Sequence, residues 1–113
     1  MIRNMSNGKI ICSKELAAKS FLQRLTGLLT RKFSDALDGI VFENCNAIHT
    51  FGMAFDIDVI FFDKDNKIIK VCSGVKPWKV VSCGVKKCSV IELPAGKTAL
   101  SECKIADIIE FQR

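Results

Sequence analysis

Two acidic residues occupy the interior of apolar segments, where a carboxylate is unusual. Asp58 lies in Ile57–Phe62, and Glu92 lies in Cys88–Leu93. Both segments are apolar on both faces, which is typical of strands covered on both sides. A buried carboxylate is costly unless it is paired or hydrogen-bonded. Each acid therefore either braces the fold, by accepting backbone amides or pairing with an arginine, or lines a polar pocket with shifted pKa values where it could act as an acid or base.

His49 is the only histidine, so any imidazole chemistry depends on it. If residues 45–49 form one strand, Cys45 and His49 are about 13 Å apart, which is too far for a nucleophile and its base. Cys45, His49, Cys83 and Cys88 are suitable ligand types for zinc, but their spacing matches no standard zinc motif, and no metal or other cofactor is expected. The chain also lacks a P-loop, a dinucleotide fingerprint and a Gly-x-Ser-x-Gly elbow.

The composition fits one folded domain over residues 1–113. Of the 113 residues, 49% are hydrophobic and 26% are charged, with two prolines and seven glycines. These proportions exclude collagen, low-complexity linkers and intrinsically disordered chains. The longest stretch without a formal charge, Asn44–Phe55, has twelve residues. A membrane-spanning helix needs about 20, so no membrane span is expected.

The N-terminal segment and the cysteines favour a cytoplasmic location. Met1–Leu16 is interrupted by charges and has no apolar h-region, so it does not resemble a secretory signal. The six cysteines include no Cys-x-x-Cys pair, and a chain of this length can build a core without disulfides. We therefore expect most of the cysteines to act as small buried hydrophobes.

The net charge of +5 is concentrated in the second half of the chain. Residues 76–104 carry six lysines against two acids. Nucleic-acid-binding surfaces usually interleave such lysines with arginines or aromatics, whereas this segment has only Trp78 and no arginine. A solvated lysine face is the better interpretation, and no nucleic-acid partner is expected.

The apolar period predicts one helix followed by strands. Ser20 and Gln23 have the spacing of a capping box, and an apolar stripe then predicts a helix that ends near Arg31. After the helix the period changes to two. Strands or extended segments are expected at residues 9–13, 40–42, 47–50, 57–62, 67–75, 88–93 and 108–111, with one helical turn at 98–103. The expected fold is mainly β: a compact antiparallel β-sandwich or barrel-like domain of six or seven short strands with one helix in the N-terminal half.

Four segments, in the same order, resemble the motifs of one known family. They are Leu25–Arg31, Asp38–Phe42, Ile48–Asp63 and Val90–Gly96. Over about residues 9–111 the chain is therefore similar to domain of unknown function family 192, in the variant that reads His-Thr-Phe-Gly-Met in its central motif. The resemblance implies a compact β-sandwich or barrel-like domain and no established activity. Its motif positions fall here on Gly27, Arg31, Gly39, His49, Met53, Asp58, Glu92 and Gly96.

Three functions fit these residues. The favoured one is a non-catalytic binding module, a monomer or weak homo-oligomer, with a polar pocket for a small polar ligand or a peptide end. Its ligand-binding residues would be Arg31, His49, Met53, Asp58, Trp78 and Glu92, flanked by Phe51. The alternative is a small hydrolase-type enzyme in which Asp58 and Glu92 divide the acid and base roles and His49 shares proton transfer. The third is a structural or partner-binding protein in which the polar residues are internal braces. The first two require Asp58, Glu92 and His49 to meet.

Overall fold

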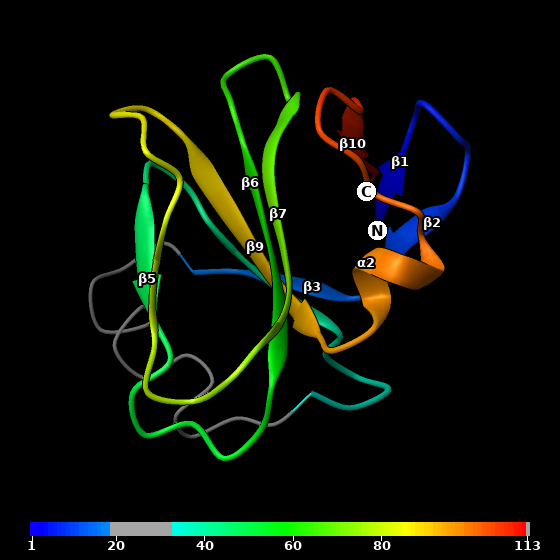
Figure 1. Ribbon diagram of the computed structural model, residues 1–113. Coiled ribbons are helices and arrows are strands. Elements are labelled where there is room, and N and C mark those ends of the chain that lie inside the picture. The colour runs from blue at the N-terminus through cyan, green and yellow to red at the C-terminus, as the bar shows by residue number, and fades with distance from the viewer. Residues whose placement is uncertain (19–32, 113) are drawn as a thin grey trace.

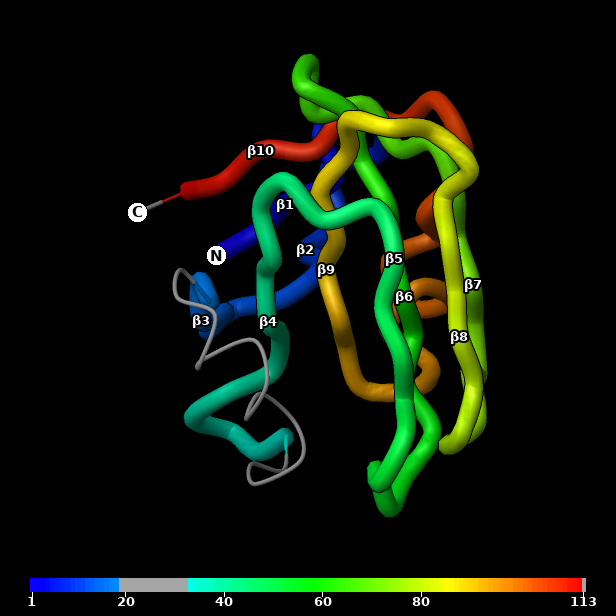
Figure 2. Tube along the Cα trace, turned by 90° about the vertical axis from the view of Figure 1, so that its left-hand side faces the viewer, coloured from blue at the N-terminus to red at the C-terminus, as the bar shows by residue number. Residues whose placement is uncertain are grey.

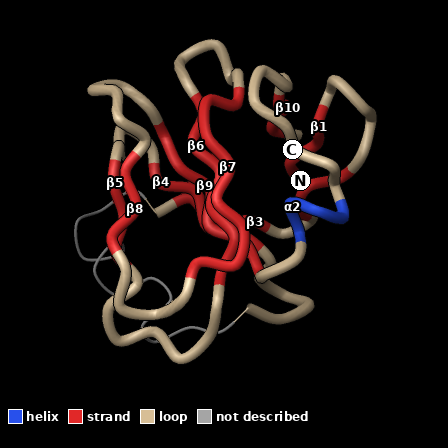
Figure 3. The backbone as a smooth tube through the Cα atoms, in the orientation of Figure 1, coloured by secondary structure: helices blue, strands red, loops and turns tan. Residues whose placement is uncertain are grey.

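The computed structural model describes residues 1–18 and 33–112 and is mainly β, as the sequence predicts (Figure 1). The helix predicted from Ser20 to Arg31 lies outside these residues. The described part has ten strands in three open sheets and one short helix, which Figure 3 distinguishes by colour. In chain order they are β1 (Ile2–Asn4), β2 (Ile10–Cys12), β3 (Glu15–Ala17), β4 (Gly39–Phe42), β5 (Ala47–His49), β6 (Ile57–Phe62), β7 (Ile68–Val75), β8 (Val80–Ser82), β9 (Ser89–Pro94), α2 (Lys97–Leu100) and β10 (Ile109–Phe111).

Three strands, β1, β3 and β8, are absent from the sequence-based expectation of six or seven. Each has three residues, which is too few to show a clear alternation of apolar and polar positions. The helix α2 occupies part of the segment where one helical turn is expected. No helix within the described ranges has the length and apolar character that crossing a membrane requires.

A five-stranded sheet forms the centre of the molecule, in the strand order β3-β4-β9-β6-β7. Neighbouring strands are antiparallel except β3 and β4, which are parallel. All six residues of β6 and four of the six residues of β9 are buried. Both faces of this central sheet are therefore core surfaces, as expected for strands that are apolar on both faces.

Each face of the central sheet is covered by a different small sheet. The three-stranded sheet β10-β1-β2 packs on what we call the terminal face, because it contains the first and last strands of the chain (Figures 1 and 2). The two-stranded sheet of β5 and β8, which we call the flap, packs on the opposite flap face. The terminal-face core includes Ile2, Ile11, Val41, Ile60, Phe62, Ile91, Leu93 and Ile109. The flap-face core includes Ile40, Phe42, Cys45, Met53, Ile57, Val59, Phe61, Cys88 and Val90, with Ile48 and Val81 of the flap packed against it.

The cysteines contribute to both cores. Cys12 and Cys45 are free and buried, in line with the expected role of small hydrophobes. Burial raises the pKa of Cys12 to about 12, so this thiol is protonated at neutral pH. Cys83 and Cys88 form a disulfide that closes the connection between β8 and β9.

Candidate functional site

Asp58 lies in β6 and is completely buried. Its Oδ1 accepts a hydrogen bond from the backbone N–H of Gly74 at 2.9 Å. Its Oδ2 accepts from the N–H of Gly96 at 3.0 Å and from the N–H and hydroxyl of Thr98 at 2.9 and 2.7 Å. The Thr98 hydroxyl oxygen in turn lies 2.6 Å from Ser73 Oγ. Asp58 therefore ties β7 and the turn into α2 to the central sheet, which is the geometry of a structural brace.

Glu92 lies in β9 and is 5% exposed. Its partners across the two ladders are Ile40 in β4 and Val59 in β6, and both belong to the flap-face core. Among the described residues, the Glu92 carboxyl group has no hydrogen-bond or ion-pair partner at contact distance. Burial in these apolar surroundings raises the pKa of Glu92 to about 8. The group is thus mostly a neutral carboxylic acid at pH 7.

The strand register places Asp58 and Glu92 on opposite faces of the central sheet. Asp58 pairs with Leu93, whereas Glu92 pairs with Val59. Directly paired residues share a face, and consecutive residues of a strand point to opposite faces. The packing agrees, because Val59 belongs to the flap-face core and Leu93 to the terminal-face core. The expectation that the two acids meet in one site is therefore wrong. Glu92 pairs with the residue after Asp58, and this shift of one residue places the two carboxyl groups on opposite faces.

His49 joins neither acid. In the flap, Ile48 and Val81 pack inward against the flap-face core, so the neighbouring pair His49 and Val80 points outward to solvent. Cys45 is buried, and its Sγ donates to the backbone carbonyl two residues further on at 3.0 Å. The structure therefore offers no Cys–His pair, and His49 belongs to the outer surface of the flap.

An exposed cluster on this outer surface consists of His49, Phe51, Trp78 and Val80, and we call it the aromatic patch. The Phe51 ring centroid lies 5.0 Å from that of His49 and 5.9 Å from that of Trp78, whose plane is inclined by 25° to the Phe51 ring. Phe51, Trp78 and Val80 are 43%, 70% and 66% exposed. The structure thus brings together His49, Phe51 and Trp78, which the sequence predicts at one site. Val80 was not among the expected residues, because only its pairing with His49 places it there.

Thr50 fixes the backbone that carries the patch. Its N–H donates to the Lys79 carbonyl at 2.9 Å, and its carbonyl accepts from the Trp78 N–H at 3.0 Å. Its buried hydroxyl donates to the Lys76 carbonyl at 2.7 Å and accepts from the Lys79 N–H at 2.9 Å. These bonds hold Trp78 at a φ of 66°, a left-handed conformation that costs a non-glycine residue about 1–2 kcal/mol. Such strained positions are frequent at functional sites.

The patch lies in basic surroundings. The two segments that build the flap and its connections, residues 44–55 and 76–91, contain four lysines and one histidine but no Asp or Glu. Lys76 and Lys79 flank Trp78 in sequence. Lys76 Nζ lies 3.4 Å from Asp56 Oδ2, while Lys79 forms no ion pair with any described residue. Lys79 is exposed and follows Trp78 in sequence, so the connection that carries Trp78 also carries positive charge.

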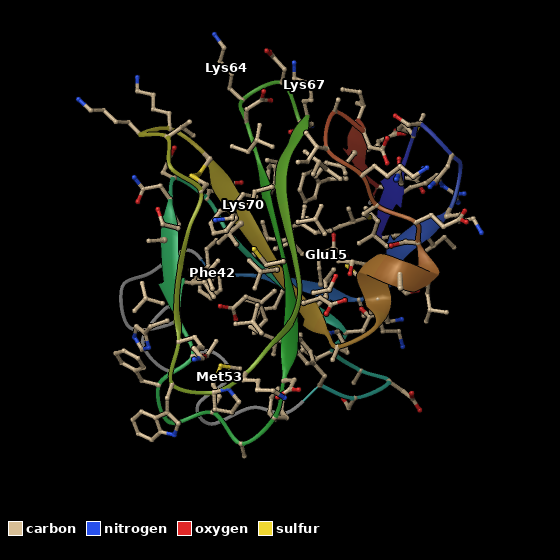
Figure 4. The ribbon with its side chains drawn as sticks, viewed as in Figure 1. Glu15, Phe42, Met53, Lys64, Lys67 and Lys70 are labelled. Atoms are coloured by element: carbon tan, nitrogen blue, oxygen red, sulfur yellow. A yellow bond between two sulfur atoms is a disulfide. The ribbon has the colours of Figure 1, made fainter. Side chains whose placement is uncertain are left out.

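Met53 and Arg31 are the remaining expected site residues. Met53 is 7% exposed and belongs to the flap-face core, in the lower part of the molecule in Figure 4. Arg31 lies outside the described residues. Within the part of the chain that the structure describes, no three His, Cys, Asp or Glu side chains gather as metal ligands. Of the predicted binding residues that the structure describes, only His49 and Trp78 are therefore exposed together.

Comparison with solved structures supports the fold. A protein of unknown function from Novosphingobium aromaticivorans is similar with a TM-score of 0.73 at 18% identity, covering 86% of this chain and 74% of that protein. A protein from Sinorhizobium meliloti, described as a transcription-regulator candidate, is similar with a TM-score of 0.76 at 19% identity, covering 96% and 88%. At these identities the likeness concerns the fold alone.

Comparison at the sequence level identifies the family. A UPF0127 protein of Thermococcus kodakarensis is 30% identical over 115 residues, covering 98% of this chain and 73% of the relative. A UPF0127 protein of Pyrococcus horikoshii is 37% identical over 97 residues, covering 83% and 84%. The family model DUF192, described as "Uncharacterized ACR", matches residues 3–111. The resemblance of the four sequence motifs is thus confirmed, and this chain belongs to the DUF192 family of uncharacterised proteins.

Proposed function

We propose that this domain is a non-catalytic binding module that takes a small polar ligand or the end of a peptide on the aromatic patch, in place of the pocket of Asp58, Glu92 and His49 expected from the sequence. The observation that carries the proposal is the position of Trp78, the only tryptophan, which is 70% exposed and stacked on Phe51 although two apolar cores are present. Large aromatic side chains dominate the energetics of cores and interfaces. An exposed, ordered tryptophan on a strained backbone is more useful as a contact surface than as a packing element.

The surroundings of the patch favour an anionic ligand with a flat or apolar part. The rings of Phe51 and Trp78 offer a flat surface for stacking, and the exposed Lys79, next to Trp78 in sequence, could supply an ammonium for a carboxylate. A peptide carboxyl end fulfils both requirements when its last side chain is aromatic or aliphatic. This geometry supports a peptide end in preference to a neutral ligand.

The acid–base arrangement of the hydrolase alternative has no support in the geometry. Asp58 and Glu92 face opposite sides of the central sheet, and Asp58 uses both carboxylate oxygens for hydrogen bonds within the fold. His49 lies on the outside of the flap, away from both carboxyl groups. For Asp58, bracing is the better interpretation.

The test uses Trp78 as its own fluorescent reporter, since the chain has no other tryptophan. The protein is titrated with short peptides that end in Phe or Leu, each with a free or an amidated carboxyl end. We expect the free-carboxyl peptides to bind more tightly and to change the Trp78 emission. Phe51→Ala and Lys79→Gln should each weaken binding by about two- to tenfold.

Leu100→Ala is the matched control, because Leu100 is 75% exposed but lies on α2, outside the flap. It should leave the affinity unchanged. Equal weakening by this variant, or equal binding of free and amidated peptides, would contradict the proposal. A single-stranded oligonucleotide serves as a further probe. If it binds the patch more tightly than the free-carboxyl peptides do, the ligand is a nucleic acid and the peptide proposal is wrong.

A further inference from the structure

A pocket of about 310 Å³ opens at one end of the central sheet and is independent of the aromatic patch. It is lined from β3, the turn after β4, the turn between β6 and β7, the start of β9 and the end of β10. Two of its lining side chains, Val41 and Phe62, belong to the terminal-face core, whereas the flap covers the other face. We call this cavity the end pocket. Its volume lies at the lower limit for small-molecule sites, which suits a ligand of about ten heavy atoms.

Two aromatic rings form the apolar wall of the end pocket. The Phe62 and Phe111 centroids are 5.5 Å apart with the ring planes at 51°. Phe62 is 5% exposed and held in the core, while Phe111 is 37% exposed at the end of β10. The pair presents ring surface that can pack against the body of a ligand and attract a cation.

The charged residues that line the end pocket are predominantly acidic. They comprise Glu15, Glu43 and Asp63 against a single lysine, Lys64. In Figure 4 Lys64 extends from the tip of the β6–β7 turn, whereas Glu15 lies nearer the middle of the molecule. The excess of carboxylates over ammonium groups gives the cavity the opposite charge preference to the aromatic patch.

The three carboxylates differ in what they already bind. Glu15 Oε1 lies 2.7 Å from the Met1 ammonium. Asp63 Oδ1 accepts the N–H groups of Asp65 and Lys67 at 2.9 and 3.0 Å, so this oxygen shapes the turn. Glu43 is exposed and has no ion-pair or hydrogen-bond partner among the described residues. Glu43 is therefore the carboxylate best placed to meet a charged ligand.

We propose that the end pocket binds a small primary amine with an aromatic or aliphatic body. The body packs against Phe62 and Phe111, and the ammonium group faces the carboxylate side of the lining, with Glu43 as its principal partner. This site goes beyond the proposed function, since it differs from the aromatic patch in position, charge and ligand.

The test compares three probes that share one ring and differ in charge: phenethylamine, phenethyl alcohol and phenylacetate. Affinities are measured by calorimetry, and the site is located from the backbone amide shifts of residues in the end pocket. We expect the amine to bind about two- to fivefold more tightly than the alcohol, and phenylacetate to bind most weakly. Phenylacetate binding as tightly as the amine, or no shift in the end pocket with any probe, would overturn the proposal.

Two variants test separately the carboxylate and the aromatic wall of the end pocket. Glu43→Gln should weaken the amine about two- to fivefold and leave the alcohol unchanged, whereas Phe111→Leu should weaken both probes. Glu102→Gln is the control acid, because Glu102 is exposed, pairs with Lys9 and lies outside the end pocket. Unchanged amine binding in Glu43→Gln would overturn the proposal.

A final variant distinguishes the end pocket from the aromatic patch. Trp78→Ala should not alter amine affinity. A loss of amine binding in this variant would place the amine on the aromatic patch and refute the assignment to the end pocket. The peptide experiment has no bearing on this outcome, so the two proposals can fail separately.

Discussion

Asp58 joins segments that are distant in sequence through one carboxylate. Gly74, at the end of β7, and Gly96 and Thr98, at the start of α2, all donate to it. Because Thr98 is buried, its N–H and hydroxyl would lose their acceptor without gaining water if the carboxylate were removed. Asp58 is therefore the shared acceptor that holds the end of β7 and the turn into α2 in place.

Replacing Asp58 by alanine should destabilise the domain strongly. Three backbone N–H groups and one hydroxyl lose their acceptor, and we expect the free energy of unfolding to fall by about 3–5 kcal/mol. Urea unfolding followed by Trp78 emission measures the loss. Asp56→Ala is the comparison, because Asp56 forms only a surface ion pair with Lys76 and should cost less than about 1 kcal/mol. A wild-type midpoint in Asp58→Ala would show that the carboxylate is not a brace.

Glu92 should make the domain less stable as the pH rises. Burial raises its pKa from 4.5 to about 8. Below pH 4.5 the carboxyl is protonated in both states, while between 4.5 and 8 the unfolded chain releases the proton and the folded chain keeps it. The free energy of unfolding therefore falls across this window, by a few kcal/mol in order of magnitude.

Glu92→Gln isolates this contribution, because the amide resembles the neutral acid and does not titrate. The variant should gain stability relative to the wild type as the pH rises from 4.5 to 8, with little difference below that window. Chemical denaturation at a series of pH values measures the difference. A constant difference over the whole window would mean that the Glu92 carboxyl ionises as easily in the folded chain as in the unfolded one.

At the scale of the elements, the connection between β7 and β8 determines the aromatic patch. Residues 76–79 form no strand of their own and are held by hydrogen bonds to Thr50, on the neighbouring connection after β5. Two of these bonds use the Thr50 backbone and two use its hydroxyl. A substitution of Thr50 can remove the two hydroxyl hydrogen bonds but leaves the two backbone hydrogen bonds in place.

Thr50→Val keeps the shape of the side chain and removes the hydroxyl. The Lys76 carbonyl and the Lys79 N–H then lose a partner, and we expect a loss of about 1–3 kcal/mol in the free energy of unfolding. Trp78 should become more mobile, which lowers its fluorescence anisotropy and weakens peptide binding. Thr50→Ser retains the hydroxyl and should restore both properties. If Thr50→Val and Thr50→Ser behave alike, the hydroxyl does not position the patch.

The sequence was informative where an element is long enough to show its period. The extended apolar segments predict β6, β7 and β9. The apolar residues on both faces of β6 and β9 also predict the burial of Asp58 and Glu92, which are 0% and 5% exposed. They could not predict which face each acid occupies, because a shift of one residue in the ladder reverses the face, and the register is set by pairing between distant strands.

The end pocket could not be predicted from the sequence for the same reason, because it depends on pairing between distant strands. Glu15, Glu43, Asp63 and Phe111 come from four separate parts of the chain, and each is ordinary in its own segment. Only the assembled sheets bring them together. The aromatic patch was partly foreseeable, because His49 and Phe51 are close in sequence, yet their contact with Trp78 depends on the pairing of β5 with β8.

For the whole molecule, the central sheet separates two candidate sites of opposite charge preference. The flap, with lysines in its connections, covers one face, and the acidic end pocket is built partly from side chains of the other. Both faces of the sheet are close-packed, so neither site contacts the other directly. Sites that share no partner are expected to contribute additively to stability.

Simultaneous binding should therefore stabilise the domain by the sum of two independent terms. Each ligand at 100-fold its dissociation constant adds about 2.7 kcal/mol, so a free-carboxyl peptide and phenethylamine together should add about 5.4 kcal/mol. Chemical denaturation with each ligand alone and with both measures the sum. Trp78→Ala should remove only the peptide term, and Glu43→Gln should reduce only the amine term. A combined effect far below the sum would show that the ligands compete for one site, and a larger one would show that the central sheet couples the two.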